Sequence, residues 1–92
     1  MNVLLIEDDK STGQFIKSCL EKWGYTTEWR KDGMQGFKTF CQKPFSIVIV
    51  DWLLPELSGI ELVKRIREIP RSDYVYILML SSVDTKTDMV HA

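Results

Sequence analysis

Short apolar runs, each followed by polar residues, constrain the fold of this 92-residue chain more than any other feature. They predict strands at residues 2–6, 45–50 and 74–80. Their nearly continuous hydrophobicity is typical of strands that are covered on both faces. A further strand is predicted at 25–30, "YTTEWR", because Thr and aromatic residues favour strands.

Between the predicted strands, apolar residues recur every three or four positions, which is typical of amphipathic helices. Helices are therefore expected at 10–23, 34–42 and about 58–69, and residues 85–92 are expected to begin another. A glycine or a proline follows each of the first three helices. The residues expected to face the core are Thr12, Phe15, Ile16, Cys19, Leu20, Trp23, Met34, Phe37, Phe40, Cys41, Leu62, Val63, Ile66 and Ile69.

Acidic residues follow two of the predicted strands. Strands that alternate with helices predict a parallel α/β sheet with helices on both faces. Glu7 and Asp8 come after the first strand and Asp51 comes after the third, so neighbouring strands would bring three carboxylates together. Two unit charges about 4 Å apart repel by roughly 4 kcal/mol at an effective dielectric of about 20. A hard divalent cation such as Mg²⁺ is the natural counter-charge for such a cluster.

Other polar residues near this edge of the sheet have alternative interpretations. Asp9 is expected to serve the following helix, because carboxylates are favourable at helix N-termini. Ser81 and Ser82 end the fourth strand, where a hydroxyl could donate to an oxygen held over the metal. Serine is also common in loops and at helix caps, so the position alone leaves both interpretations open.

Composition excludes several classes of function. A net charge of −1 and scattered basic residues argue against direct nucleic-acid binding by this segment. The chain contains no apolar stretch long enough to span a bilayer and no secretory signal, so no membrane role is expected. Cys19 and Cys41 are interpreted as reduced, buried thiols, which favours a cytoplasmic location.

The motifs resemble the receiver domain of bacterial two-component response regulators. The matching segments are "LLIEDD" (4–9), "DWLLPELSGIEL" (51–62) and "ILMLSS" (77–82), with "GY" at 24–25 and "DG" at 32–33. The resemblance covers the whole chain. It implies a flavodoxin-like, doubly wound parallel sheet with the strand order 2-1-3-4-5.

The resemblance also assigns roles to the acids. Asp51 would accept a phosphoryl group from a histidine kinase or a phosphotransfer protein, with Mg²⁺ or Mn²⁺ as the cofactor. Asp8 matches a direct metal ligand, and Glu7 matches an acid that acts mostly through water. The backbone carbonyl of Leu53 matches a third protein ligand.

Two further positions complete the implied site. Ser81 matches the hydroxyl that binds the phosphoryl group, and Ser82 matches the small residue after it. The implied function is that of a phosphoacceptor switch that controls a downstream output. Its catalysis would be limited to its own phosphoryl transfer and autodephosphorylation.

The sequence departs from the family pattern at its C-terminal side. Residues 1–92 would form a single receiver domain in which the fifth strand, the Lys after it and the fifth helix are absent. Lys86 lies too close to Ser81 to replace that Lys, so phosphoryl transfer is expected to be impaired. The fourth strand would then be an exposed apolar edge that favours self-association through residues 75–80.

Two other functions remain open from the sequence. The chain could be a receiver that only docks or dimerises. It could also be a metal-dependent phosphatase with an Asp nucleophile, although such enzymes usually place a second acid two residues later, where this chain has Leu53.

Overall fold

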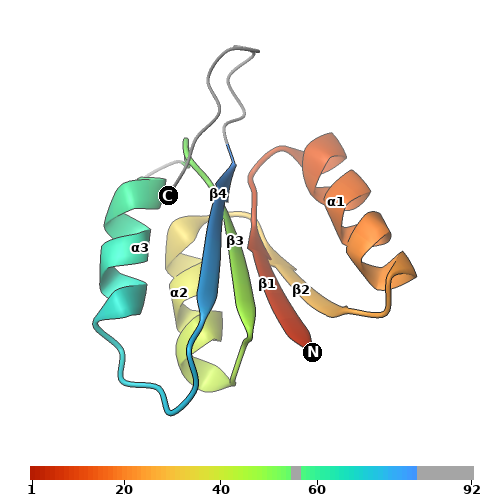
Figure 1. Ribbon diagram of the computed structural model, residues 1–92. Coiled ribbons are helices and arrows are strands. Elements are labelled where there is room, and N and C mark those ends of the chain that lie inside the picture. Colours follow the sequence, from red (N-terminus) through yellow and green to blue (C-terminus); the bar gives the residue numbers. More distant parts are fainter. Residues whose placement is uncertain (55–56, 81–92) are drawn as a thin grey trace.

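The structure, a computed structural model, describes residues 1–54 and 57–80 (Figure 1). Its strands are β1 (Asn2–Ile6), β2 (Thr26–Arg30), β3 (Ile47–Asp51) and β4 (Tyr76–Leu80). They form a parallel sheet with the order β2-β1-β3-β4. This order confirms the predicted flavodoxin-like arrangement of the first four strands.

The helices cover both faces of this sheet. α1 (Lys10–Lys22) lies against one face, and α2 (Gly33–Gln42) and α3 (Gly59–Arg67) lie against the other (Figure 1). Each helix begins at a side chain that accepts a hydrogen bond from a backbone N–H of its first turn. The capping residues are Asp9, Asp32 and Ser58.

Two apolar layers hold the helices to the sheet. The larger layer lies between the sheet and the pair α2 and α3 and contains Leu4, Ile6, Phe40, Phe45, Val48, Val50, Leu57, Leu62, Ile66 and Val75. The smaller layer lies on the α1 side, where Val3, Leu5 and Ile49 are buried. The strands β1 and β3 therefore contribute side chains to both layers, as their continuous hydrophobicity predicted.

Several residues expected in the core are exposed. Trp23 is 72% exposed because it caps the C-terminal end of α1, and Phe15 is also exposed. Gly13 is buried in α1, and Phe15, two residues later, is rotated by about 200° around the helix axis, so it points away from the sheet.

The prediction that Cys41 is buried is wrong. α2 faces the sheet with Gly33, Gly36, Thr39 and Phe40, and Cys41 lies outside that stripe. Met34 is exposed for the same reason.

The predicted boundaries differ from the observed ones by one or two residues. β3 begins later than expected and includes Asp51, which pairs with Leu80 in the ladder. β4 begins at Tyr76 rather than at residue 74, β2 begins at Thr26 rather than at residue 25, and α3 ends at Arg67 before the proline. The predicted helix at 85–92 lies outside the described residues.

Candidate functional site

Three carboxylates meet at the carboxyl ends of β1 and β3. The two strands are parallel neighbours in which Ile6 pairs with Val50, so the residues that follow are also adjacent. Carboxylate oxygens of Glu7, Asp8 and Asp51 all lie within 4.8 Å of one another. The predicted convergence of these acids is therefore observed.

Glu7 and Asp51 are completely buried, whereas Asp8 is exposed to solvent. One oxygen of each buried carboxylate accepts a backbone hydrogen bond: Glu7 Oε2 from the Asp9 amide at 3.0 Å, and Asp51 Oδ1 from the Leu53 amide at 3.1 Å. The other oxygens, Glu7 Oε1 and Asp51 Oδ2, have no hydrogen-bond partner among the described residues. Buried polar atoms are almost always paired, so these two oxygens are available to a partner that the described residues do not supply.

Burial and mutual repulsion alter the acidity of the cluster. The pKa of Glu7 is raised from 4.5 to about 7. Burial is the main cause, the neighbouring Asp51 and Asp8 carboxylates add to it, and the hydrogen bond from the Asp9 amide opposes it. The pKa of Asp8 is also raised, first by partial burial and then by Asp51. The raised pKa values of Glu7 and Asp8 show that the cluster disfavours further negative charge.

This arrangement fits a hard divalent cation. Mg²⁺ prefers oxygen ligands and is commonly held by one or two carboxylates together with water and phosphate oxygens. Two buried oxygens without a partner among the described residues, together with the exposed carboxylate of Asp8, supply such donors. Mn²⁺ accepts the same oxygen donors.

Asp9 does not belong to the cluster. Its Oδ2 accepts a hydrogen bond from the Thr12 amide at 2.8 Å and so caps α1, as predicted from its position. The hydrogen bonds from the Thr12 side chain and amide lower the pKa of Asp9. The acids at 7, 8 and 9 are thus divided between a site and a helix cap.

The remaining predicted site residues are only partly described. The Leu53 amide supports Asp51, and the role of the Leu53 carbonyl as a metal ligand stays a prediction. Ser81 and Ser82 lie outside the described residues. Their roles in phosphoryl binding also stay predictions.

Sequence reasoning missed one residue that contacts the site. The indole Nε1 of Trp29 donates to the backbone carbonyl of Glu7 at 2.9 Å. The sequence pattern identifies Trp29 only as an aromatic residue of a strand. Gly13 on α1 makes room for the Trp29 ring, but the spacing of residues along the chain does not show that these two residues are in contact.

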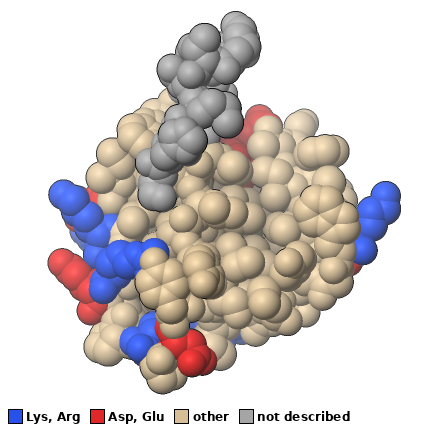
Figure 2. All heavy atoms as spheres, viewed as in Figure 1, with Lys and Arg blue, Asp and Glu red and all other residues tan. Residues whose placement is uncertain are grey.

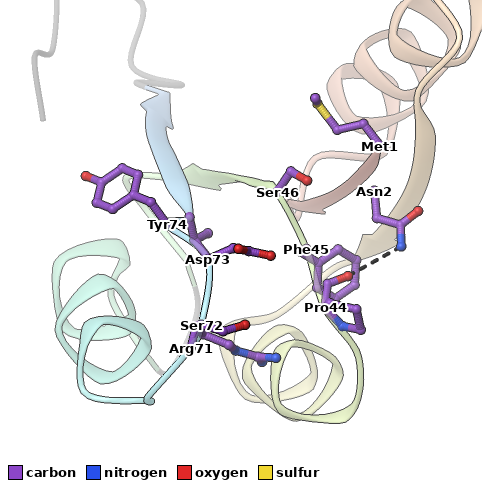
Figure 3. Close-up of a pocket in the computed structure, with 10 residues that line it drawn as sticks. Met1, Asn2, Pro44, Phe45, Ser46, Arg71, Ser72, Asp73 and Tyr74 are labelled. Carbon is purple, nitrogen blue, oxygen red and sulfur yellow. Dashed lines mark hydrogen bonds between the residues drawn. The ribbon is translucent and has the colours of Figure 1, made fainter.

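A cavity of about 320 Å³ lies at the opposite end of the sheet (Figure 3). Residues that precede or begin β1, β3 and β4 line it, including Asn2, Ser46 and Asp73. Asn2 Nδ2 donates to the Pro44 carbonyl across its rim at 3.4 Å. The cavity therefore lies at the other end of the sheet from the cluster of Glu7, Asp8 and Asp51. Its lining contains both a positive and a negative side chain, Arg71 and Asp73.

Comparisons with known proteins agree with the fold. A model of the response regulator receiver domain family matches residues 3–92. The chain is 32% identical over 90 residues to the uncharacterized transcriptional regulatory protein YclJ of Bacillus subtilis. This match covers 98% of this chain and 38% of YclJ. It is 33% identical over 87 residues to the response regulator receiver protein CpdR of Brucella abortus. That match covers 94% of this chain and 72% of CpdR. The solved structure of the chemotaxis response regulator CheY4 of Vibrio cholerae matches with a TM-score of 0.84 at 28% identity, over 91% of this chain and 70% of that one.

The chain therefore belongs to the response regulator receiver domain family, the regulatory modules of two-component systems. Receiver domains typically bind Mg²⁺ at an acidic pocket, and this chain contains a cluster of three acidic residues. The chain spans 38% of YclJ and 40% of the transcriptional regulatory protein QseB of Haemophilus influenzae. No helix among residues 1–54 and 57–80 is long and apolar enough to cross a membrane.

Proposed function

We propose that this chain is a phosphoacceptor signalling module in which Asp51 receives a phosphoryl group from a histidine kinase or a phosphotransfer protein. The observation that carries the proposal is a pair of buried oxygens on Glu7 and Asp51 that no residue in the described part of the chain contacts by a hydrogen bond, and that lie beside the exposed carboxylate of Asp8. Family membership supports the signalling role. The chain is proposed to act as a regulatory domain in the cytoplasm, and its only chemistry would be its own phosphorylation and dephosphorylation.

Each residue has a defined part in this proposal. Asp51 Oδ2 is the nucleophile, because Oδ1 is already fixed by the Leu53 amide. Asp8, Glu7, Asp51 and the Leu53 carbonyl would hold Mg²⁺ or Mn²⁺, with Glu7 acting mostly through water. The bound cation would offset the charge of the incoming phosphoryl group.

The serines at the end of β4 extend the site. Ser81 would donate its hydroxyl to the transferred phosphoryl group, and Ser82 would leave room beside it. A phosphoryl group adds between one and a half and two negative charges in a tight pocket. The proposed switch is a change of the surface near Ser81 that a partner reads as the output.

Phosphorylation with acetyl phosphate and Mg²⁺ tests the proposal. Intact-mass measurement should show the gain of one phosphoryl group on a fraction of the molecules of residues 1–92, because transfer is expected to be impaired, and chelation of the metal should prevent the gain. Asp51→Asn should abolish the gain. The matched control is Asp9→Asn, which should retain it, because Asn also caps helices.

The same experiment separates the alternatives. Labelling that survives Asp51→Asn would contradict the proposal. A folded protein that binds Mg²⁺ but accepts no phosphoryl group would favour a receiver that only docks or dimerises. Rapid turnover of a phosphorylated small molecule would favour the metal-dependent phosphatase, which the position of Leu53, two residues after Asp51, disfavours.

A second proposal concerns self-association through β4. Among the described strands, β4 lies at the edge of the sheet, and residues 76–80 carry no charge. Tyr76 and Leu78 are 64% and 54% exposed. Figure 2 shows that the surface over β4 is uncharged, whereas charged side chains gather over α3 and at the margins. We propose that a second copy of the chain pairs along this edge.

A further inference from the structure

The backbone of Glu7 is held by the last two residues of β2. The Glu7 amide donates to the Arg30 carbonyl at 3.0 Å, which continues the β1–β2 ladder by one step. The Glu7 carbonyl accepts from Trp29 Nε1 at 2.9 Å. A side chain therefore supplies the hydrogen bond that secures β1 just past its last paired residue.

The hydrogen bond to the Glu7 carbonyl determines more than the position of Glu7. That carbonyl belongs to the peptide unit that joins Glu7 to Asp8, and a peptide unit is planar. Fixing its oxygen therefore restricts the direction in which the chain enters Asp8. On the far side, the Asp9 amide is tied to Glu7 Oε2. Asp8, the exposed acid of the cluster, thus lies between two peptide groups that are each held by a hydrogen bond.

The indole is itself fixed by its surroundings. It packs over Gly13 of α1, where an added Cβ would overlap ring atoms Cζ2 and Cε2 and lie 2.8 Å from Nε1. The Lys31 ammonium lies 5.7 Å from the ring centroid. A glycine on α1 and a tryptophan on β2 are therefore matched so that the indole N–H points at the Glu7 carbonyl.

We infer that Trp29 is a positioning residue for the divalent-cation site, acting through the Glu7–Asp8 peptide. The inference rests on the proposed function, because it requires that Glu7, Asp8 and Asp51 hold a cation. Groups that orient metal ligands typically change metal affinity by about 10–100-fold when they are removed. Trp29 contacts the peptide of two ligands rather than a ligand side chain, so the lower end of that range is expected.

Trp29→Phe tests the inference, because it removes the N–H donor and keeps a smaller aromatic ring at this position of β2. The ring atoms over Gly13 are removed together with the donor, so the effect of lost packing is measured separately with Ile16→Val. The dissociation constant for Mn²⁺, measured by calorimetry or by electron paramagnetic resonance of the free ion, should rise by about 10-fold. Trp23→Phe is the matched control, because Trp23 is exposed at the far end of α1 and should leave Mn²⁺ affinity unchanged. Unchanged affinity in Trp29→Phe would overturn the inference.

A loss of stability must be separated from a loss of positioning. Ile16→Val trims a half-buried neighbour in the same α1-side layer without touching the hydrogen bond. All variants are compared at a temperature at which circular dichroism shows them folded. An equal loss of Mn²⁺ affinity in Ile16→Val would overturn the inference, because general loosening would then explain the effect. If the unaltered protein binds no Mn²⁺, the proposed function fails and the inference fails with it.

Gly13→Ala supplies a second route to the same bond. The added methyl group would displace the indole while the N–H donor remains in the chain. The variant should weaken Mn²⁺ binding to a similar extent, and adding Trp29→Phe to it should cause no further loss. Full additivity of the two effects would show that they act separately and would overturn the inference.

Discussion

At the scale of single residues, the burial of Glu7 and Asp51 costs free energy that hydrogen bonds from the described residues only partly offset. Each carboxylate receives one backbone hydrogen bond, and each keeps one oxygen that no described residue contacts. Burying a charge without full compensation is unfavourable. The free energy of unfolding of the cation-free protein is therefore expected to be lower than it would be if these oxygens were paired.

This cost predicts an unusual dependence of stability on pH. The pKa of Glu7 is raised from 4.5 to about 7 in the folded protein. Between these values the unfolded chain has lost a proton that the folded chain keeps, so the free energy of unfolding should fall as pH rises. The slope approaches about 1.4 kcal/mol per pH unit and gives a total of roughly 1–3 kcal/mol. Urea denaturation in the presence of a chelator, at pH 5 and pH 8, measures the change.

Glu7→Gln is the matched variant for this measurement. It should remove most of the slope and stabilise the cation-free protein at pH 8, and a smaller slope should remain because the pKa of Asp8 is also raised. Added Mg²⁺ should restore stability to the unaltered protein at pH 8, since it binds the folded state alone. A wild-type stability that increases from pH 5 to pH 8 would contradict this account.

At the scale of secondary-structure elements, α3 shows how sequence pattern and packing combine. Ser58 caps the helix by accepting a hydrogen bond from the Glu61 amide at 3.2 Å. Leu62 and Ile66 face the sheet and are buried, whereas Ile60 is exposed on the other side. The helix is therefore held by one apolar stripe.

Truncation of this stripe should be costly. Leu62→Ala should lower the free energy of unfolding by about 2–5 kcal/mol, because it leaves a cavity in the larger apolar layer. The control Ile60→Ala should cost less than about 1 kcal/mol. Urea denaturation of the two variants makes the comparison, and equal losses would contradict the packing seen here.

The elements were largely predictable, and the failures have physical causes. Apolar periodicity located every described helix and strand to within one or two residues, and it placed the acids at a common edge. It failed for Trp23 and Cys41, because a helix stripe is set by the surface it contacts and α2 uses small residues there. Trp29 was missed because its partner is a backbone carbonyl on another strand, which no spacing along the chain encodes.

At the scale of the whole molecule, the two edges of the described sheet differ in how well they are protected. On β2, Glu28 pairs with Arg30 at 3.0 Å and with Lys43 at 2.5 Å. Charged side chains on an edge strand discourage pairing with another chain. On β4 the exposed positions are Tyr76 and Leu78, which continue the α1-side apolar layer beyond Ile47 and Ile49. Of the two edges of the described sheet, the β4 edge is therefore the one proposed to pair with a second copy.

This asymmetry predicts association of residues 1–92 through β4. Sedimentation at increasing concentration should show an average mass that rises above the 10.7 kDa of one chain toward twice that value. Leu78→Lys should weaken association by placing a charge in the apolar edge, as edge strands of monomeric proteins do. Ile60→Lys is the matched control, because Ile60 is similarly exposed on α3 and lies away from the edge. A mass that stays at one chain at every concentration, or association that survives Leu78→Lys but not Ile60→Lys, would show that β4 is not the contact surface.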